Sequence, residues 1–349
     1  MRFPILDIRL WRRDPHAFAA ELRHACHHIG FFQVRHDVPP LLVKKASALS
    51  RAFFALPDHE KKSMSYEQSA QFRGYMSNGV ENTAGKPDLR EQVEIAQEAT
   101  PAAATAMPPH RRLAGWNQWP DAALPELQPT IMEYAACMGQ LADELTEALS
   151  LSIGLERGSL SKLFLPAPHW QLKLASYTPA PEAAATSTAE APIGVGAHTD
   201  SGFLTLLLQD GSGGLQAFAQ GEWQDVPPAG EEVVVCNLGE VAEMLSGGYL
   251  LATPHRVLLP PARRLSIPYF HNPQLDAQIE VLQLPSELPW EREADYDTKR
   301  HWRRGSNAFI DSYGLNAFKS LARSHPKVFA RHHPDLEVTS DGRVVPREV

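Results

Sequence analysis

The first part of the chain carries helical and extended patterns of apolar positions in turn. The segment ELRHACHHIG ends at a glycine, a common helix stop, and GFFQVRHD reads as a short buried strand. LLVKKASALSRAFFAL then has apolar residues at helical spacing, and an amphipathic helical pattern runs from Leu127 to about Leu163. We therefore expect helix, strand and helix over residues 14–64, and a long helix after an irregular stretch over residues 65–120.

The second half changes to short β-type runs separated by Gly/Pro turns: WQLKLASY, FLTLLLQD, GLQAFA, EEVVVCNLG, HRVLLP and RRLSIPYF. Many short strands at such spacing predict a β-sandwich or jelly roll. The Ala-rich stretches at residues 98–110 and 181–191 are expected to be surface loops, and from about Tyr296 the pattern becomes helical again.

Composition narrows the class of protein. At 43% hydrophobic and 21% charged residues, the 349-residue chain is typical of a globular protein with an ample core. A net charge of −8 without a basic stripe argues against nucleic-acid binding, and no apolar run approaches the roughly 18 residues of a membrane span. The N-terminus lacks the pattern of a signal peptide, and three scattered cysteines predict no disulfide framework. We expect a cytoplasmic monomer.

One polar pair stands at the mouth of an apolar, strand-like run, in GVGAHTDSGFLTLLLQD. In an extended segment residues i and i+2 project to the same face, so His198 and Asp200 can converge on one point, as a metal site requires. About one His-x-Asp is expected by chance, and a second copy, His333 and Asp335, lies in a charged, proline-interrupted segment. The motif alone fits a solvated turn as well, but its strand context favours a metal site.

A downstream segment, TPHRVLLPPARRLSIPYF, can complete the site. If the chain turns tightly at Pro261-Ala262, Pro268 lies opposite His255, and Arg264 and Ser266 share that face. Arg264 would then stand about 13 Å from His255 along the strands. A metal at His255 and a guanidinium at Arg264 could hold the two ends of a short dicarboxylic acid, since arginine binds carboxylates through two parallel hydrogen bonds.

Two histidines and one carboxylate with open positions suit a non-haem Fe(II) oxygenase. A zinc hydrolase could use the same three residues, but Arg264-x-Ser266 would then have no obvious role. A catalytically silent 2-oxoglutarate-binding module is a further alternative, against which the intact set of ligands argues.

The sequence resembles the 2-oxoglutarate/Fe(II)-dependent dioxygenases of the isopenicillin-N-synthase-like group. FPILDIRL, GFFQVRHD, FFALPDHEKK and GWNQWP are similar to the N-terminal region and linker of that group, and HTDSGFLTLLLQD, GLQAF, CNLGE, SGGYLLATPHRV and RLSIPYF to its oxygenase core. The resemblance implies an α+β fold with a double-stranded β-helix (jelly-roll) core and flanking helices. It divides the chain into an N-terminal mixed region (1–120), a core with its preceding helix (121–295) and a C-terminal helical segment (296–349).

The same resemblance implies roles for individual residues. The iron ligands would be His198, Asp200 and His255, and the cosubstrate 2-oxoglutarate would be bound by Arg264, Ser266 and Tyr177. The implied reaction uses Fe(II), 2-oxoglutarate and O2, and couples decarboxylation to succinate and CO2 with oxidation of a small-molecule substrate.

A narrower resemblance lies in GYMSNGVENTAGKPDLRE, which is similar to the bacterial and fungal ethylene-forming enzymes, enzymes that use 2-oxoglutarate with L-arginine. It implies that Glu81 and Thr83 hold the substrate guanidinium, that Arg323 meets its carboxylate and that Phe270 forms an aromatic wall. Lys173, where that subgroup has arginine, is the fifth expected substrate residue. The alternative within the family is a hydroxylase or desaturase of another small molecule.

Overall fold

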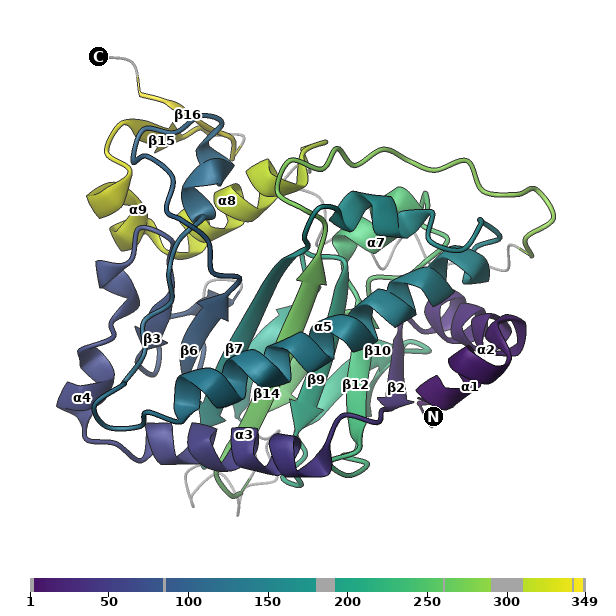
Figure 1. Cartoon of the computed structure of the whole chain (residues 1–349), viewed down its shortest axis with the longest axis horizontal. Coiled ribbons are helices and arrows are strands. Elements are labelled where there is room, and N and C mark those ends of the chain that lie inside the picture. Colours follow the sequence, from purple (N-terminus) through teal and green to yellow (C-terminus); the bar gives the residue numbers. More distant parts are fainter. Residues whose placement is uncertain are drawn as a thin grey trace.

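The computed structural model describes residues 3–83, 86–179, 192–259, 261–289, 310–340 and 342–347. Figure 1 shows a large sheet covered on one side by long helices, with the C-terminal helices at one end and the first helices at the other. The predicted loop at residues 181–191 and the start of the C-terminal helical pattern at Tyr296 lie outside the described residues.

The strands form two main sheets. The larger has the order β1-β2-β12-β9-β14-β7-β6-β3, and the smaller β11-β10-β13-β8. Neighbours are antiparallel except for β1 and β2. The strands are β1 (Ile5–Asp7), β2 (Phe31–Arg35), β3 (Gly74–Met76), β6 (Arg90–Ala96), β7 (His169–Tyr177), β8 (Ile193–His198), β9 (Leu204–Gln209), β10 (Leu215–Ala219), β11 (Glu222–Asp225), β12 (Val233–Leu238), β13 (His255–Leu258) and β14 (Arg264–Asn272). Short pairs are formed by β4 (Asn82–Thr83) with β5 (Lys86–Pro87), and by β15 (Leu336–Val338) with β16 (Val344–Pro346).

The helices are α1 (Ile8–Arg13), α2 (Pro15–His28), α3 (Pro40–Phe54), α4 (Asp58–Lys62), α5 (Leu127–Ser152), α7 (Glu240–Leu245), α8 (Tyr313–Ser324) and α9 (Pro326–His332). The predicted helix, strand and helix of the N-terminal region are α2, β2 and α3. The long helix ends at Ser152 rather than near Leu163, because Gly154 takes a positive φ of 76° and the chain then forms only a short 3₁₀ turn at Leu160–Phe164. None of the described helices is long and apolar enough to cross a membrane.

Two apolar layers hold the sheets in place. The larger core lies between the helices and one face of the large sheet, where α5 crosses the strands (Figure 1) and buries Ile131, Met138 and Leu145. A smaller core, containing Val195, Ala217 and Val257, lies between the two sheets. The fold is therefore the α+β jelly roll that was expected, and the space between its two sheets is where polar residues of the candidate site gather.

Candidate metal centre and active site

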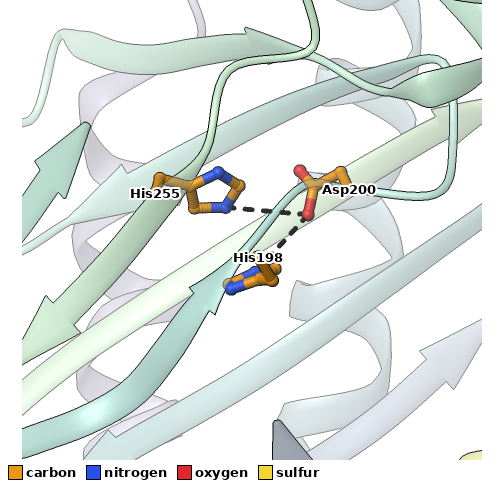
Figure 2. Close-up of side chains that lie close together, drawn as sticks. All are labelled: His198, Asp200 and His255. Atoms are coloured by element: carbon orange, nitrogen blue, oxygen red, sulfur yellow. Dashed lines mark ion pairs between the residues drawn. The ribbon is translucent and has the colours of Figure 1, made fainter. Parts of the chain in front are cut away.

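The two candidate histidine ligands face each other across a strand pair. His198 ends β8 and His255 begins β13, and the two residues are direct partners in this antiparallel pair. Asp200 follows in the turn after β8, and its Oδ1 lies 3.8 Å from His198 Nε2 and 3.7 Å from His255 Nε2. Figure 2 shows the three side chains pointing toward one another. The structure thus brings together the three predicted ligands.

Each ligand is oriented by a hydrogen bond at its other polar atom. His198 Nδ1 donates to the carbonyl of Gly196 at 2.8 Å, and His255 Nδ1 to that of Thr253 at 3.1 Å. This fixes the tautomer that leaves both Nε2 lone pairs facing Asp200. Asp200 Oδ2 accepts hydrogen bonds from Thr205 Oγ1 at 2.5 Å and Asn237 Nδ2 at 2.7 Å, which leaves Oδ1 for a metal.

The protonation states of the ligands suit a metal cation. Burial and the nearby His255 lower the pKa of His198 to about 4. Burial alone would raise the pKa of Asp200, but the two histidines and the hydroxyl and amide donors outweigh it, so the pKa lies below its ordinary value. At neutral pH the site therefore offers neutral His198 and a carboxylate, the forms that bind metals. Two imidazoles and one carboxylate fit Fe(II).

The turn that carries Asp200 is tied to the start of α7. The backbone N–H groups of Gly239, Glu240 and Val241 donate to the carbonyls of Phe203, Asp200 and Gly202 at 2.9, 2.8 and 2.9 Å. A Cβ on Gly239 would lie 2.2 Å from the Gly202 carbonyl oxygen, so only glycine allows this close approach.

Arg264 forms a buried cationic site on the large sheet. It is 1% exposed, its Nη1 donates to Ser266 Oγ at 3.1 Å and its Nε to the Gly213 carbonyl at 2.9 Å. Its guanidinium carbon lies 4.7 Å from the centre of the Tyr177 ring. The remaining nitrogen, Nη2, is buried and has no hydrogen-bond partner among the described residues. A buried guanidinium with a vacant donor fits a carboxylate ligand.

The predicted hairpin between His255 and Arg264 is wrong. β13 pairs with β8 and β10 in the small sheet, whereas β14 pairs with β7 and β9 in the large one. Pro268 consequently lies opposite Leu207 and not His255. Both strands are apolar enough to be buried in either sheet, so local pattern could not distinguish a hairpin from a crossing between sheets. Arg264 and Ser266, two positions apart, do lie on the same face of β14, as predicted.

A cavity of about 260 Å³ opens beside the candidate metal ligands. Of the predicted substrate residues, four line it together with His198 and Asp200: Glu81, Thr83, Lys173 and Phe270. Arg323 is exposed on α8 and is not among the lining residues, although Ser320, Leu321 and Ser324 of the same helix are. A role of Arg323 in substrate binding therefore stays a prediction.

The cavity wall contains an ion network that the sequence analysis missed in part. Lys173 Nζ lies 2.9 Å from Glu81 Oε1 and 2.7 Å from Glu94 Oε1, and Arg90 pairs with the other oxygen of Glu81. Burial alone would raise the pKa of Glu81, but Lys173 and Arg90 lower it below its ordinary value. Arg90 and Glu94 are four positions apart in REQVEIA and therefore share one face of β6, and charged residues on one face of a buried strand were the available signal.

The second His-x-Asp copy has a structural role. His333 Nε2 donates to the carbonyl of Ala70 at 2.9 Å, and Asp335 pairs with the buried Arg112. Within the described ranges, the groups of side chains that could hold a metal are His198–Asp200–His255 and Glu81–Glu94–His325. In the second group Lys173 already occupies the position between the two carboxylates.

Comparisons with known proteins agree with this site. Residues 3–122 match the family model of the non-haem dioxygenase in morphine synthesis N-terminal region, and residues 170–273 that of the 2OG-Fe(II) oxygenase superfamily. A 2-oxoglutarate-dependent dioxygenase, frbJ, of Dothideomycetidae sp. is 31% identical over 339 residues, which cover 93% of this chain and 90% of the relative. The chain belongs to the 2OG-Fe(II) oxygenase superfamily.

Further relatives and solved structures cover most of this oxygenase. Homoarginine-6-hydroxylase 2-ODD-C23 of Glycine max is 32% identical over 266 residues, 75% of this chain and 79% of the relative. A putative 2OG-Fe(II) oxygenase family protein from Caulobacter crescentus aligns with a TM-score of 0.68 at 26% identity, covering 86% of this chain and 98% of that one. The jelly-roll core and the enzyme class expected from the sequence are thus confirmed, with Fe(II) and 2-oxoglutarate as cofactor and cosubstrate.

Proposed function

We propose that this 2OG-Fe(II) oxygenase hydroxylates a small amino acid with a guanidino group, L-arginine or homoarginine. The observation that carries the proposal is Glu81, a carboxylate in the wall of the cavity that also contains His198 and Asp200. A guanidinium matches a carboxylate through two parallel hydrogen bonds. The 30–32% identity to homoarginine-6-hydroxylases of Glycine max and Arabidopsis thaliana supports the same class of substrate.

Different residues of the chain would hold the cosubstrate and the metal. Arg264 and Ser266 would hold the distal carboxylate of 2-oxoglutarate, and His198, Asp200 and His255 would hold the metal. When bound, iron(II) with 2-oxoglutarate and O2 supplies the oxidising chemistry, which consumes the cosubstrate to succinate and CO2 and inserts one oxygen atom into a C–H bond of the substrate.

Charge in the cavity favours a cationic substrate. Glu81 and Glu94 face one ammonium, Lys173, and Glu81 shares a second cation, Arg90, with Asp88. A substrate guanidinium at Glu81 would bring the positive charge that balances these three carboxylates. Thr83 and Phe270 line the same cavity and would bound the substrate on two further sides.

The test is a substrate screen on protein reconstituted with Fe(II) and 2-oxoglutarate under anaerobic conditions and then exposed to O2. Arginine or homoarginine should stimulate succinate formation and gain one oxygen atom by mass. Glu81→Gln should lose most of this stimulation, whereas Glu156→Gln, at an exposed position after α5, should retain it. No response to either amino acid would overturn the proposed substrate class.

Ethylene formation from 2-oxoglutarate stays a prediction. The relatives described above support the superfamily, and the homoarginine-6-hydroxylases among them support a guanidino substrate. None of them supports the narrower resemblance to ethylene-forming enzymes. Headspace gas chromatography in the same assay tests it: ethylene in the presence of arginine would restore that resemblance, and hydroxylated product without ethylene would leave a hydroxylase.

A further inference from the structure

Three residues from neighbouring strands form one rung of the large sheet between the two ends of the active site. Tyr177 on β7 is the direct partner of Arg90 on β6 and of Arg264 on β14. Arg264 lies over the ring of Tyr177, and Arg90 Nη1 donates to its hydroxyl oxygen at 3.4 Å. The tyrosine, 2% exposed, is thus held between two guanidinium groups.

The guanidinium of Arg90 also reaches the substrate end. Its Nη2 pairs with Glu81, the cavity carboxylate, and lies 3.3 Å from Asp88 Oδ2. The side chains of Arg90 and Glu81 are 13% and 14% exposed, so little water screens the pair. Arg90 is therefore the one described side chain for which the structure shows contacts to both Glu81 and Tyr177.

We propose that Arg90 is a positioning residue that couples the substrate end of the cavity to the 2-oxoglutarate end through Tyr177. With Glu81 free of substrate, Arg90 is drawn toward Glu81. A cation bound to Glu81 weakens that attraction, and Arg90 shifts its donors toward Tyr177. The orientation of the phenol beside Arg264 then depends on whether substrate is present.

The electrostatics of Tyr177 support this arrangement. Burial alone would raise the pKa of its phenol, but Arg90 and Arg264 outweigh burial and lower it. A phenol made more acidic in this way is a stronger hydrogen-bond donor to a carboxylate held at Arg264. Because coupling between two binding sites is reciprocal, 2-oxoglutarate and substrate should each change the affinity of the other by the same factor.

The inference has two halves, and only the second rests on the proposed function. The first half, the effect of Arg90 on 2-oxoglutarate binding through Tyr177, needs no knowledge of the substrate. It can be measured by calorimetry of 2-oxoglutarate binding to Mn(II)-loaded protein, in the absence of turnover. Arg90→Lys keeps a charge for Glu81 but loses the planar fork that reaches Tyr177 as well.

We expect Arg90→Lys and Tyr177→Phe each to weaken 2-oxoglutarate binding by about tenfold, the lower end of what loss of a hydrogen bond to a charged group costs. The double variant should bind 2-oxoglutarate no more weakly than Tyr177→Phe alone, because both changes break the same contact, the one between Arg90 and Tyr177. Arg112→Lys is the matched control, a buried arginine paired with Asp335 away from the cavity. Unchanged binding in Arg90→Lys, or additive effects in the double variant, would overturn the proposal.

The second half uses arginine as the probe. In the unaltered protein, saturating arginine should change 2-oxoglutarate affinity by about fivefold or more, within the usual range for coupled sites, and in Arg90→Lys the change should disappear. A coupling that survives in Arg90→Lys would refute the role of Arg90. If arginine does not bind the unaltered protein, the proposed substrate fails, while the arm without substrate still decides the contact between Arg90 and Tyr177.

Discussion

Thr205 offers a direct test of how the candidate metal ligand Asp200 is held. The residue lies on β9, is 5% exposed, and donates its hydroxyl to Asp200 Oδ2 at 2.5 Å. Thr205→Val replaces the hydroxyl by a methyl group of similar size, so the packing of the strand is largely kept. Asp200 Oδ2 then retains one donor, Asn237.

The expected loss can be worked out in two ways. A hydrogen bond to a charged group contributes about 1.5–3 kcal/mol. Changing an outer partner of a metal ligand typically costs about 10–100-fold in metal affinity, which corresponds to about 1.4–2.8 kcal/mol. Both estimates predict that Thr205→Val binds Fe(II) at least about tenfold more weakly.

The assay is an anaerobic Fe(II) titration in the presence of 2-oxoglutarate, followed by the metal-to-ligand charge-transfer band in the visible. Asp200→Ala should abolish the band, and His333→Ala should leave it unchanged. Thr146→Val is the matched control, because Thr146 is buried in α5 and donates its hydroxyl to the Ala142 carbonyl at 2.8 Å. Fe(II) affinity within twofold of the unaltered protein in Thr205→Val would refute the reasoning, as would an equal loss in Thr146→Val.

Three further predictions address the cosubstrate site, the turn after Asp200 and the buried histidines. Arg264→Ala should raise the 2-oxoglutarate concentration needed for activity well over tenfold while Fe(II) binding stays nearly intact, since loss of a buried charge partner costs about 2–5 kcal/mol. An unchanged requirement would contradict the assignment of Arg264 to the 2-oxoglutarate site. Gly239→Ala should lower the free energy of unfolding in urea by about 1–3 kcal/mol and weaken metal binding, because the added Cβ would meet the Gly202 carbonyl. Gly211→Ala, with no atom within 4 Å of the added carbon, should change neither the unfolding free energy nor metal binding. Burial lowers the pKa of His169 and His271 to about 3 and of His198 to about 4, below the roughly 6.5 of an unfolded histidine. Below about pH 6.5 the unfolded chain therefore binds more protons than the folded one, and the unfolding free energy of the metal-free protein should fall as the pH drops from about 6.5 toward 4. A urea-denaturation profile that stays flat over that interval would contradict this prediction.

The sequence predicted the parts of the site that depend on spacing within one strand. Arg264 and Ser266 share one face of β14 because residues two apart in a strand point the same way. His198 ends β8 and Asp200 lies in the turn that follows, so the spacing identified this pair although Asp200 is not itself in the strand. The pairing of His255 with His198 joins strands 57 positions apart, and no local pattern determines which sheet a buried strand enters. The hairpin prediction failed at that point, although the residues themselves were identified.

The supporting residues could have been found from a different signal. Thr205 and Asn237 are polar side chains flanked by apolar residues in the strands LTLLLQ and VVVCNL, and they are direct partners in the β9–β12 pair. A polar residue in a buried strand needs a hydrogen-bond partner, so each pointed to a buried polar site. Which partner it finds depends on the pairing of β9 and β12, which the sequence pattern does not define.

The alternation of side chains along the adjacent strands β6, β7 and β14 determines how far the proposed substrate end of the active site lies from the 2-oxoglutarate end. On β7, Tyr177 faces Arg264 while Lys173, four residues away and on the same face, pairs with Glu81. Four residues of strand span about 13 Å, so the proposed substrate and 2-oxoglutarate sites would lie on the same face at two fixed depths. A one-residue slip of β7 against β6 and β14 would turn both side chains to the opposite face. The even spacing of these residues therefore constrains the site as strongly as their chemistry, and it explains why Arg90, which reaches both depths, lies directly opposite Tyr177.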